Sequence, residues 1–231
     1  MGKLGTKNVG GDLSSKILEP GNHKCKIVGV KLEDAKYKPG ALNLIFTLVG
    51  PEKDDYEGFL IDKDKPELGH YKGQVGYVKA TDWAFADGTT KSGIEVVMVD
   101  EILKFIKRLC EVTGCMEWYD AQDNLHDSIE DFVAAMEKEK PFADIIIDCC
   151  IAGREYMSRR GYLNCDLYFP RFSRTGVPVE KAGTKPSKLI KYDAETHLKK
   201  AEPKEVEEFD NSTEEMSETD GIPEGNTDFE V

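Results

Sequence analysis

Five of the six arginines of this chain are concentrated in residues 154–174, where tyrosines and phenylalanines alternate with them. A guanidinium group pairs with phosphate through two parallel hydrogen bonds and stacks on bases, and an aromatic face accepts an unpaired base. The composition of this stretch therefore predicts an interface for a single nucleic-acid strand. The residues predicted to contact the strand here are Arg154, Tyr156, Arg159, Arg160, Tyr162, Tyr168, Arg171, Phe172 and Arg174.

Lysines on other segments are predicted to extend this interface. Lys24, Lys26 and Lys31 alternate with apolar residues on an early strand, and four further lysines follow between residues 181 and 191. Lysines on a solvated face look the same in a sequence, so the arginine-rich stretch carries the prediction.

The last predicted strand, residues 161–169, alternates two kinds of side chain. Because successive side chains of a strand point to opposite faces, one face is assigned to the core and the other to the groove. Tyr162 and Tyr168 are on the predicted groove face. The core face holds Leu163, Cys165, Leu167 and Phe169. The alternative is that the aromatic residues cap a core and the arginines form a solvated rim.

Other chemistries lack their residue patterns. The chain has no phosphate-binding glycine loop, no GxGxxG, no HExxH and no GxSxG, so we predict that it is not an enzyme. Its six cysteines form no CxxC pair, and no histidine stands beside a cysteine pair at ligand spacing, so we predict no metal and no cofactor. The cysteines are interpreted as buried free thiols in a reducing cytosol. A metal-dependent nuclease built from the carboxylates of residues 51–150 is a less favoured alternative.

The net charge of −13 is unevenly distributed along the chain. Residues 1–50 carry 8 basic and 4 acidic side chains, and residues 151–200 carry 11 and 5. Residues 51–150 carry 11 and 23, and residues 201–231 carry 1 and 12. This last segment has few apolar residues and is predicted to be disordered. We interpret it as a solubilising tail, or as an acidic peptide that competes for the basic groove or recruits partners.

Alternation of apolar and polar residues predicts strands at residues 21–32 and 42–49, with a turn at Pro39-Gly40 between them. Shorter strands are predicted at residues 56–61 and 71–80. The chain therefore begins with three or four strands.

A helical segment is predicted next. Its first helix covers residues 102–114 with Asp100 as the N-cap, and its second starts at Ser128 with a Ser-x-x-Asp capping pattern. Strands at residues 142–151 and 161–169 follow.

This order matches an OB-type Greek-key barrel, in which five strands carry a helix between the third and the fourth. We therefore predict a mainly β fold with one or two helices inserted there. Residues 1–16 are predicted to be flexible, residues 17–200 to form the nucleic-acid-binding domain, and residues 201–231 to form the acidic tail. No apolar run reaches the roughly 18 residues of a membrane span, and no secretory signal is present, so we expect a soluble cytoplasmic protein.

Four segments share a layout with a known family. They are Glu19-Pro20-Gly21-x-x-Lys24-x-Lys26-Ile27, the strand Leu44-x-Phe46-x-Leu48, the helix Ile102–Gly114 and the late Tyr162-Leu163-Asn164. Over about residues 17–170 this layout resembles phage-encoded single-stranded DNA-binding proteins. The acidic end is similar to the tails of bacterial and phage single-strand binders.

The resemblance implies an OB-fold, sequence-independent binding of single-stranded DNA, and roles in replication and recombination in the host cytoplasm. The sequence leaves RNA open as an alternative partner. It also implies that residues 201–231 contact replication or recombination proteins. Bacterial relatives end in an Asp-Ile-Pro-Phe-type peptide, whereas here Ile222-Pro223 is internal and Phe229 is third from the end, so that docking does not carry over directly. The competing interpretation is a phage structural or interaction protein that binds no nucleic acid.

Overall fold

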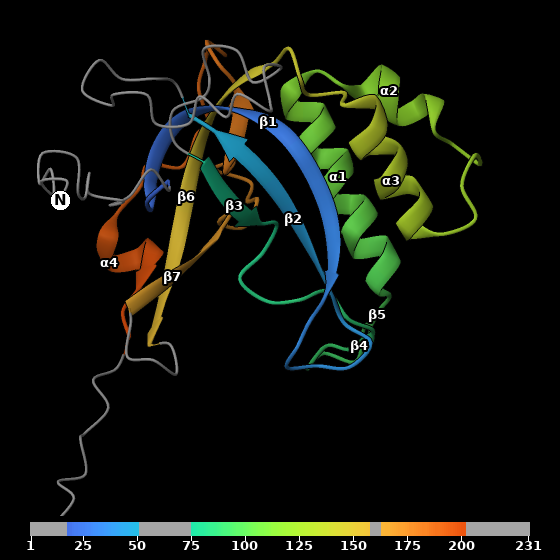
Figure 1. Ribbon diagram of the computed structural model, residues 1–231, viewed down its shortest axis with the longest axis horizontal. Helices are drawn as coiled ribbons and strands as arrows, with labels where there is room; N and C mark the ends of the chain where they lie inside the picture. The colour runs from blue at the N-terminus through green and yellow to red at the C-terminus, as the bar shows by residue number, and fades with distance from the viewer. Residues whose placement is uncertain (1–17, 51–74, 158–162, 202–231) are drawn as a thin grey trace, which may run out of the picture. The chain divides into compact units, whose positions relative to one another are not determined.

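The computed structural model describes residues 18–50, 75–157 and 163–201. These residues form a mainly β fold around a mixed seven-stranded sheet, with three of the four helices inserted between the third and the fourth long strands (Figure 1). The strands of this sheet are, in chain order, β1 (Gly21–Asp34), β2 (Leu42–Val49), β3 (Val75–Lys79), β6 (Ile146–Met157), β7 (Leu163–Tyr168), β8 (Val179–Lys181) and β9 (Leu198–Lys199).

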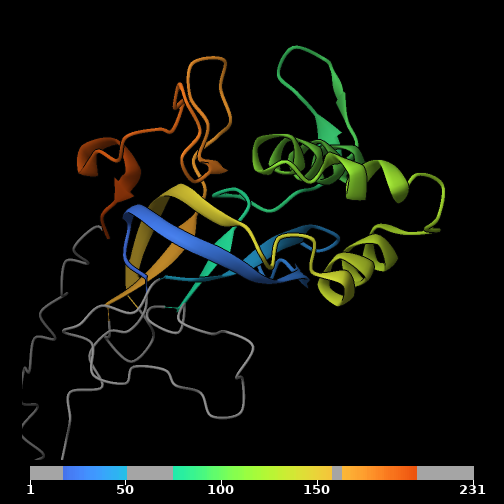
Figure 2. The same cartoon turned by 90° about the horizontal axis from the view of Figure 1, so that it is seen from above.

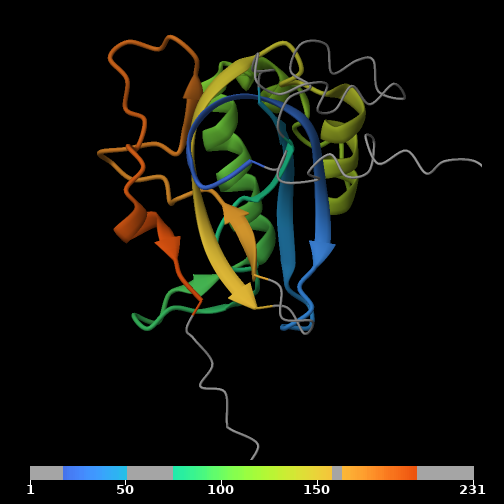
Figure 3. The same ribbon diagram turned by 60° about the vertical axis from the view of Figure 1, so that its left-hand side comes forward.

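Within one group of strands, each strand pairs with two others. The group consists of β1, β2, β3, β6 and β7. The second half of β1 pairs antiparallel with β2, and its first half, residues 21–26, pairs antiparallel with β6. β2 pairs antiparallel with β3, β3 pairs parallel with β7, and β7 pairs antiparallel with β6. A register shift between Ile27 and Gly29 marks the point where β1 changes neighbour, and Figure 3 shows the curvature of the strands there.

The predicted strands are confirmed where the structure describes them. β1 and β2 occupy the two N-terminal predicted segments, and the turn between them has Gly40 at φ 75°, a conformation that glycine adopts without strain. β3 and β7 fall inside their predicted ranges. The predicted strand at 56–61, the flexible segment 1–16 and residues 202–231 of the tail lie outside the described residues.

Three helices and a small hairpin connect β3 to β6. The hairpin consists of β4 (Gly88–Thr89) and β5 (Glu95–Val96), and the helices are α1 (Met98–Thr113), α2 (Met116–Ala121) and α3 (Ile129–Glu139). The apolar side of α1 packs on the sheet and buries Ile102, Phe105, Ile106, Leu109 and Cys110.

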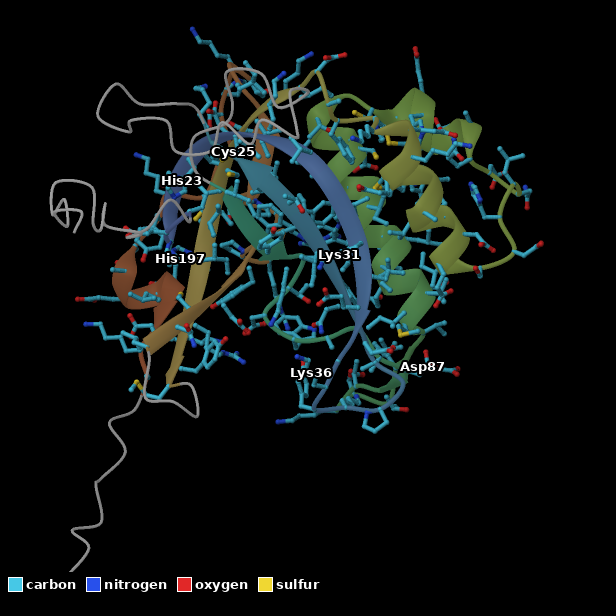
Figure 4. All side chains as sticks on the ribbon, in the orientation of Figure 1. His23, Cys25, Lys31, Lys36, Asp87 and His197 are labelled. Carbon is cyan, nitrogen blue, oxygen red and sulfur yellow. The ribbon has the colours of Figure 1, made fainter. Side chains whose placement is uncertain are left out.

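The predicted ends of two elements are corrected. Helix α1 begins at Met98 rather than after Asp100, because the carboxylate of Asp87 accepts a hydrogen bond of 2.7 Å from the Met98 amide and satisfies the helix end. Asp87 is labelled in Figure 4. At α3 the predicted cap is confirmed, since the Ser128 hydroxyl accepts a 3.1 Å bond from the Asp131 amide. Strand β6 starts four residues later than the predicted 142–151 segment and continues to Met157.

Between β7 and residue 201, the structure has three short elements that were not predicted. They are β8, helix α4 (Ala194–His197) and β9. The buried carboxylate of Glu180 on β8 accepts hydrogen bonds from the Ser187 hydroxyl at 2.5 Å and the Lys188 amide at 3.0 Å. Because a buried carboxylate is stable only when it is hydrogen-bonded, Glu180 fixes the loop after β8 against the sheet.

The cysteines are free thiols, as predicted, but one of them is not buried. Cys25, Cys110, Cys115, Cys149 and Cys150 are buried, whereas Cys165 is exposed. Burial raises the pKa of the Cys110 thiol to about 12 and that of Cys150 to about 11. Since the thiolate is the reactive form, these two buried thiols are poor nucleophiles at neutral pH. In the part of the chain that the structure describes, no helix is long and apolar enough to cross a membrane.

Candidate nucleic-acid interface

A pocket of about 540 Å³ lies between the loop that follows β3, helix α1 and the segment that follows β7. Figure 2 shows the β4–β5 hairpin and the 170–192 segment rising on the same side of the sheet. The lining of this pocket includes four aromatic and four basic side chains. They are Trp83, Phe85, Phe105, Phe172, Lys38, Lys104, Arg108 and Arg171.

The mouth of the pocket holds a stacked pair of side chains. The guanidinium carbon of Arg171 lies 3.9 Å from the centre of the Trp83 ring, and Trp83 is 40% exposed. Tryptophan is the best aromatic ring for a cation–π contact, and arginine is the cation found most often in one. The pair therefore presents a planar, positively charged surface to solvent.

Hydrogen bonds to neighbouring segments hold Trp83 in place. The Thr81 hydroxyl donates a 2.5 Å bond to the Trp83 carbonyl, and the Ala84 amide donates a 2.7 Å bond to the hydroxyl of Tyr37 in the β1–β2 loop. Phe85 then forms two backbone bonds with Leu42 at the start of β2, of 2.8 and 2.9 Å. The loop that carries Trp83 is thus fixed to β2 and to the β1–β2 loop.

Arg171 is positioned by the aromatic residues on either side of it. Phe169 is 1% exposed, and its amide donates a 2.9 Å bond to the Lys79 carbonyl. Phe172 packs edge-on against Phe105 of α1, with ring centres 5.4 Å apart. With Phe169 buried in the core and Phe172 packed on Phe105, the exposed Arg171 side chain lines the pocket together with Trp83.

The positive charges around the pocket exceed the negative ones. Lys104 pairs with Glu101 one helical turn earlier, at 2.8 Å, and Glu101 is the acidic residue of the described lining. Lys38, Arg108 and Arg171 form no ion pair with any residue that the structure describes. Three cations without carboxylate partners make this pocket an attractive position for an anionic group.

Next to this pocket, Asp82 holds two further cations. One oxygen of its carboxylate accepts bonds from Arg154 at 3.1 Å and Lys199 at 2.6 Å. The other oxygen is buried and accepts no hydrogen bond from any residue that the structure describes, and only 11% of the Asp82 side chain is exposed. Asp82 lines a second pocket, of about 200 Å³, which shares Trp83 and Arg171 with the first.

Tyr168 is buried, and this corrects its predicted exposure on a groove face. It does lie on the opposite side of β7 from Leu167 and Phe169, as predicted, but Lys199 of β9 lies over its ring at 5.8 Å and only 7% of the residue is exposed. Burial raises the pKa of the Tyr168 hydroxyl, and the Asp82 carboxylate raises it further. Its ring face is therefore not free to stack on a base in this structure.

The exposure of Phe172 and Leu163 also differs from the prediction. Phe172 is half-buried against Phe105, so it contributes the wall of the pocket rather than an open stacking face. Leu163 was assigned to the core, yet it is 57% exposed because β7 extends beyond the core at that end.

The lysines predicted on β1 are not among the described residues that line the pocket. Lys24 pairs with Asp148 on β6 at 2.8 Å. Lys31, labelled in Figure 4, pairs with Glu33 and lies 5.7 Å from the centre of the exposed Tyr77 ring on β3. Lys26, on the same strand, is half-buried.

The remaining predicted residues are distributed as follows. Tyr156 on β6 is 45% exposed and pairs in register with Asn164. Arg174 is exposed in the turn after Phe172. Arg159, Arg160 and Tyr162 lie outside the described residues. Of the predicted set, Arg171 and Phe172 line the larger pocket.

Sequence reasoning missed Trp83, Lys38, Lys104 and Arg108. Arg108 is the one arginine outside the predicted stretch, and the fold brings it to the same pocket as Arg171. Lys104, Phe105 and Arg108 fall on one side of α1, a spacing that a helical projection could have identified. No local pattern marks Trp83 or Lys38.

Among the described residues, no group of three or more histidine, cysteine, aspartate or glutamate side chains is placed to hold a metal ion. No protein-family model, no curated protein and no solved structure matches this chain.

Proposed function

We propose that this chain binds single-stranded DNA without sequence preference, and that its five doubly paired strands form an OB-type barrel that carries the binding surface. The strand order supports the barrel, because β1 pairs with both β2 and β6, and β3 runs parallel to β7. An OB-fold binds oligonucleotides on its second and third strands and on the loops after its first and fourth strands. Here the loop after β1 contains Tyr37 and Lys38.

The observation that carries the proposal is the pocket that Lys38, Arg108, Arg171 and the exposed Trp83 ring line together. None of these three cations forms an ion pair with a residue that the structure describes. Proteins that bind single strands combine cations for the backbone with aromatic or guanidinium planes for the bases, and this pocket offers both. A duplex keeps its base faces stacked, so the aromatic part of such a site favours unpaired strands.

The resemblance to phage single-strand binders supports a non-enzymatic role in replication and recombination, in the cytoplasm of the host. RNA fits the same chemistry, because stacking and phosphate contacts do not require deoxyribose.

Salt titration of strand binding tests this proposal. The affinity for a labelled single-stranded oligonucleotide is expected to fall with salt, with a log–log slope of roughly −0.7 for each phosphate neutralised. A double Arg171→Ala, Arg174→Ala variant is expected to bind more weakly and to flatten the slope. The charge-matched control is Lys107→Ala with Lys138→Ala, which removes two exposed cations from α1 and α3 that line neither pocket. Absence of binding at low salt contradicts the proposal.

We further propose that the acidic residues 201–231 compete with DNA for the basic groove or recruit replication and recombination proteins. The support is the charge of the segment, with 12 acidic and 1 basic side chain. A tethered segment acts at a high effective concentration, and its charges are screened beyond about 8 Å at physiological salt. A chain truncated after Lys200 is therefore expected to bind the oligonucleotide more tightly at low salt, with the difference closing as salt rises. Equal affinities at every salt concentration contradict competition and leave recruitment or a solubilising role.

A further inference from the structure

We infer that the Trp83–Arg171 pocket holds one unstacked nucleobase of the bound strand, with the adjoining phosphate on Lys38 and Arg108. This inference rests on the proposed single-strand binding. It adds a defined one-nucleotide site to a surface that otherwise binds by general charge and stacking.

The size and lining of the pocket fit a base. Its volume of about 540 Å³ falls within the range of about 300–1,000 Å³ that is typical of small-molecule sites. Ala80, Ala84 and Phe85 contribute apolar surface, and Phe105 and Phe172 form an aromatic wall. A base that leaves its stack is held in this way, by aromatic and apolar side chains.

The cations at the rim fit the phosphate of the same nucleotide. Lys38 comes from the β1–β2 loop and Arg108 from α1, so two separate elements supply charge to one pocket. Neither has an ion-pair partner in the described parts of the chain, so no protein contact must break before either binds a phosphate. A bidentate guanidinium contact from Arg108 is the stronger of the two expected interactions.

The two threonine hydroxyls of the lining are already engaged, and this predicts little discrimination among bases. The Thr81 hydroxyl donates to the Trp83 carbonyl, and the Thr90 hydroxyl accepts a 3.0 Å bond from the Ile94 amide and lies 2.9 Å from the Ser92 hydroxyl. Base identity is read through hydrogen bonds to base edges. Since Thr81 and Thr90 are used within the protein, the preference among bases is expected to follow stacking strength.

A base held in this pocket also explains selection against duplexes. A paired base would have to leave its partner and its stack, at a cost of a few kcal/mol, before it could enter. An unpaired strand meets a much smaller cost. The pocket thus supplies a physical reason for single-strand preference that surface charge alone does not.

Tryptophan fluorescence can report on the pocket directly, because the chain has two tryptophans and Trp118 lies away from it. Trp118 packs on Phe132 and donates a 2.6 Å bond to Glu139, so Trp118→Phe keeps the ring contact and leaves Trp83 as the single emitter. In this full-length variant, deoxyadenosine monophosphate is expected to quench the Trp83 emission saturably and to compete with a single-stranded oligonucleotide.

A pair of variants then distinguishes binding in the pocket from a general effect of positive surface charge. Arg108→Ala is expected to weaken mononucleotide binding at least fivefold, whereas Lys107→Ala, which removes the neighbouring exposed charge of the same helix, should leave it unchanged. If Trp118→Phe fails to fold, the indole NMR signal of Trp83 in the unmodified chain provides the same readout.

The outcomes distinguish this inference from the proposed function. Oligonucleotide binding without a change in Trp83 emission overturns the one-base pocket and leaves single-strand binding intact. Equal losses in the Arg108→Ala and Lys107→Ala variants also overturn it. If neither the oligonucleotide nor the mononucleotide binds, the proposed function and the inference fail together.

Discussion

Replacing Phe46 with alanine is expected to lower the free energy of unfolding by about 3–5 kcal/mol, the usual cost of emptying a buried aromatic position. Phe46 on β2 is fully buried. Its ring centre lies 5.9 Å from that of Phe105 on α1 and 6.1 Å from that of Phe169 after β7. These three rings join the sheet, the main helix and the segment that carries Arg171, so the cavity left by the substitution cannot close by moving one element alone.

This loss would be a large part of the 5–15 kcal/mol that stabilises a typical domain. Urea denaturation of the unmodified chain and the variant, compared at equal m-values, measures it. Leu125→Ala is a suitable control, because Leu125 is 67% exposed and its truncation should change stability by less than about 0.5 kcal/mol. A Phe46→Ala loss as small as that of the control would show that the aromatic cluster does not hold the fold together.

Replacing Asp82 with asparagine is expected to tighten single-strand binding on the order of tenfold at low salt, or about 1.4 kcal/mol. The Asp82 carboxylate now neutralises Arg154 and Lys199, which are each about half exposed, at 48% and 50%. Asparagine keeps the size of the side chain and removes the charge, so both cations become available to phosphate. Each additional phosphate contact should steepen the salt slope by roughly 0.7.

Asp144→Asn is the matched control for Asp82→Asn. It also removes one carboxylate charge, from an exposed residue that forms no ion pair within the described residues. Its effect on affinity should be small, because the charge is lost away from both pockets. Weaker binding by Asp82→Asn would mean that Asp82 orients Arg154 and Lys199 for the strand instead of competing with it.

Sequence patterns predicted the elements whose formation depends on residues close to them in the chain. The alternation in β1 and β2 and the Ser128 cap of α3 depend on neighbouring residues, and all three were predicted from the sequence. The start of α1 was not, because its first amide bonds to Asp87, eleven residues earlier and across a hairpin. The two-residue strand β9 pairs with β6, and no alternation over so short a segment can be recognised.

The residues of the candidate site also fall into those that the sequence predicted and those that only the fold brings together. Arg171 was predicted because arginine clustering is visible along the chain. Arg108 and Trp83 reach the same pocket through the packing of α1 and the backbone bonds of the loop after β3, which no sequence window contains. Tyr168 had the correct strand face, but β9 brings Lys199 over its ring. The side of a strand was therefore predictable, and what covers it was not.

The change of neighbour along β1 has a consequence for biosynthesis. Its first half pairs with residues 146–151, which lie 120 to 130 residues further along the chain. At a translation rate of about 5–20 residues per second, this half of β1 waits roughly 6 to 26 seconds on the ribosome for its partner. The second half of β1 can pair with β2 almost at once, because the two strands are joined by a short loop. The N-terminal hairpin is thus exposed along one strand edge while the helices are being made, and during that interval its unpaired edge is a template on which another chain can pair.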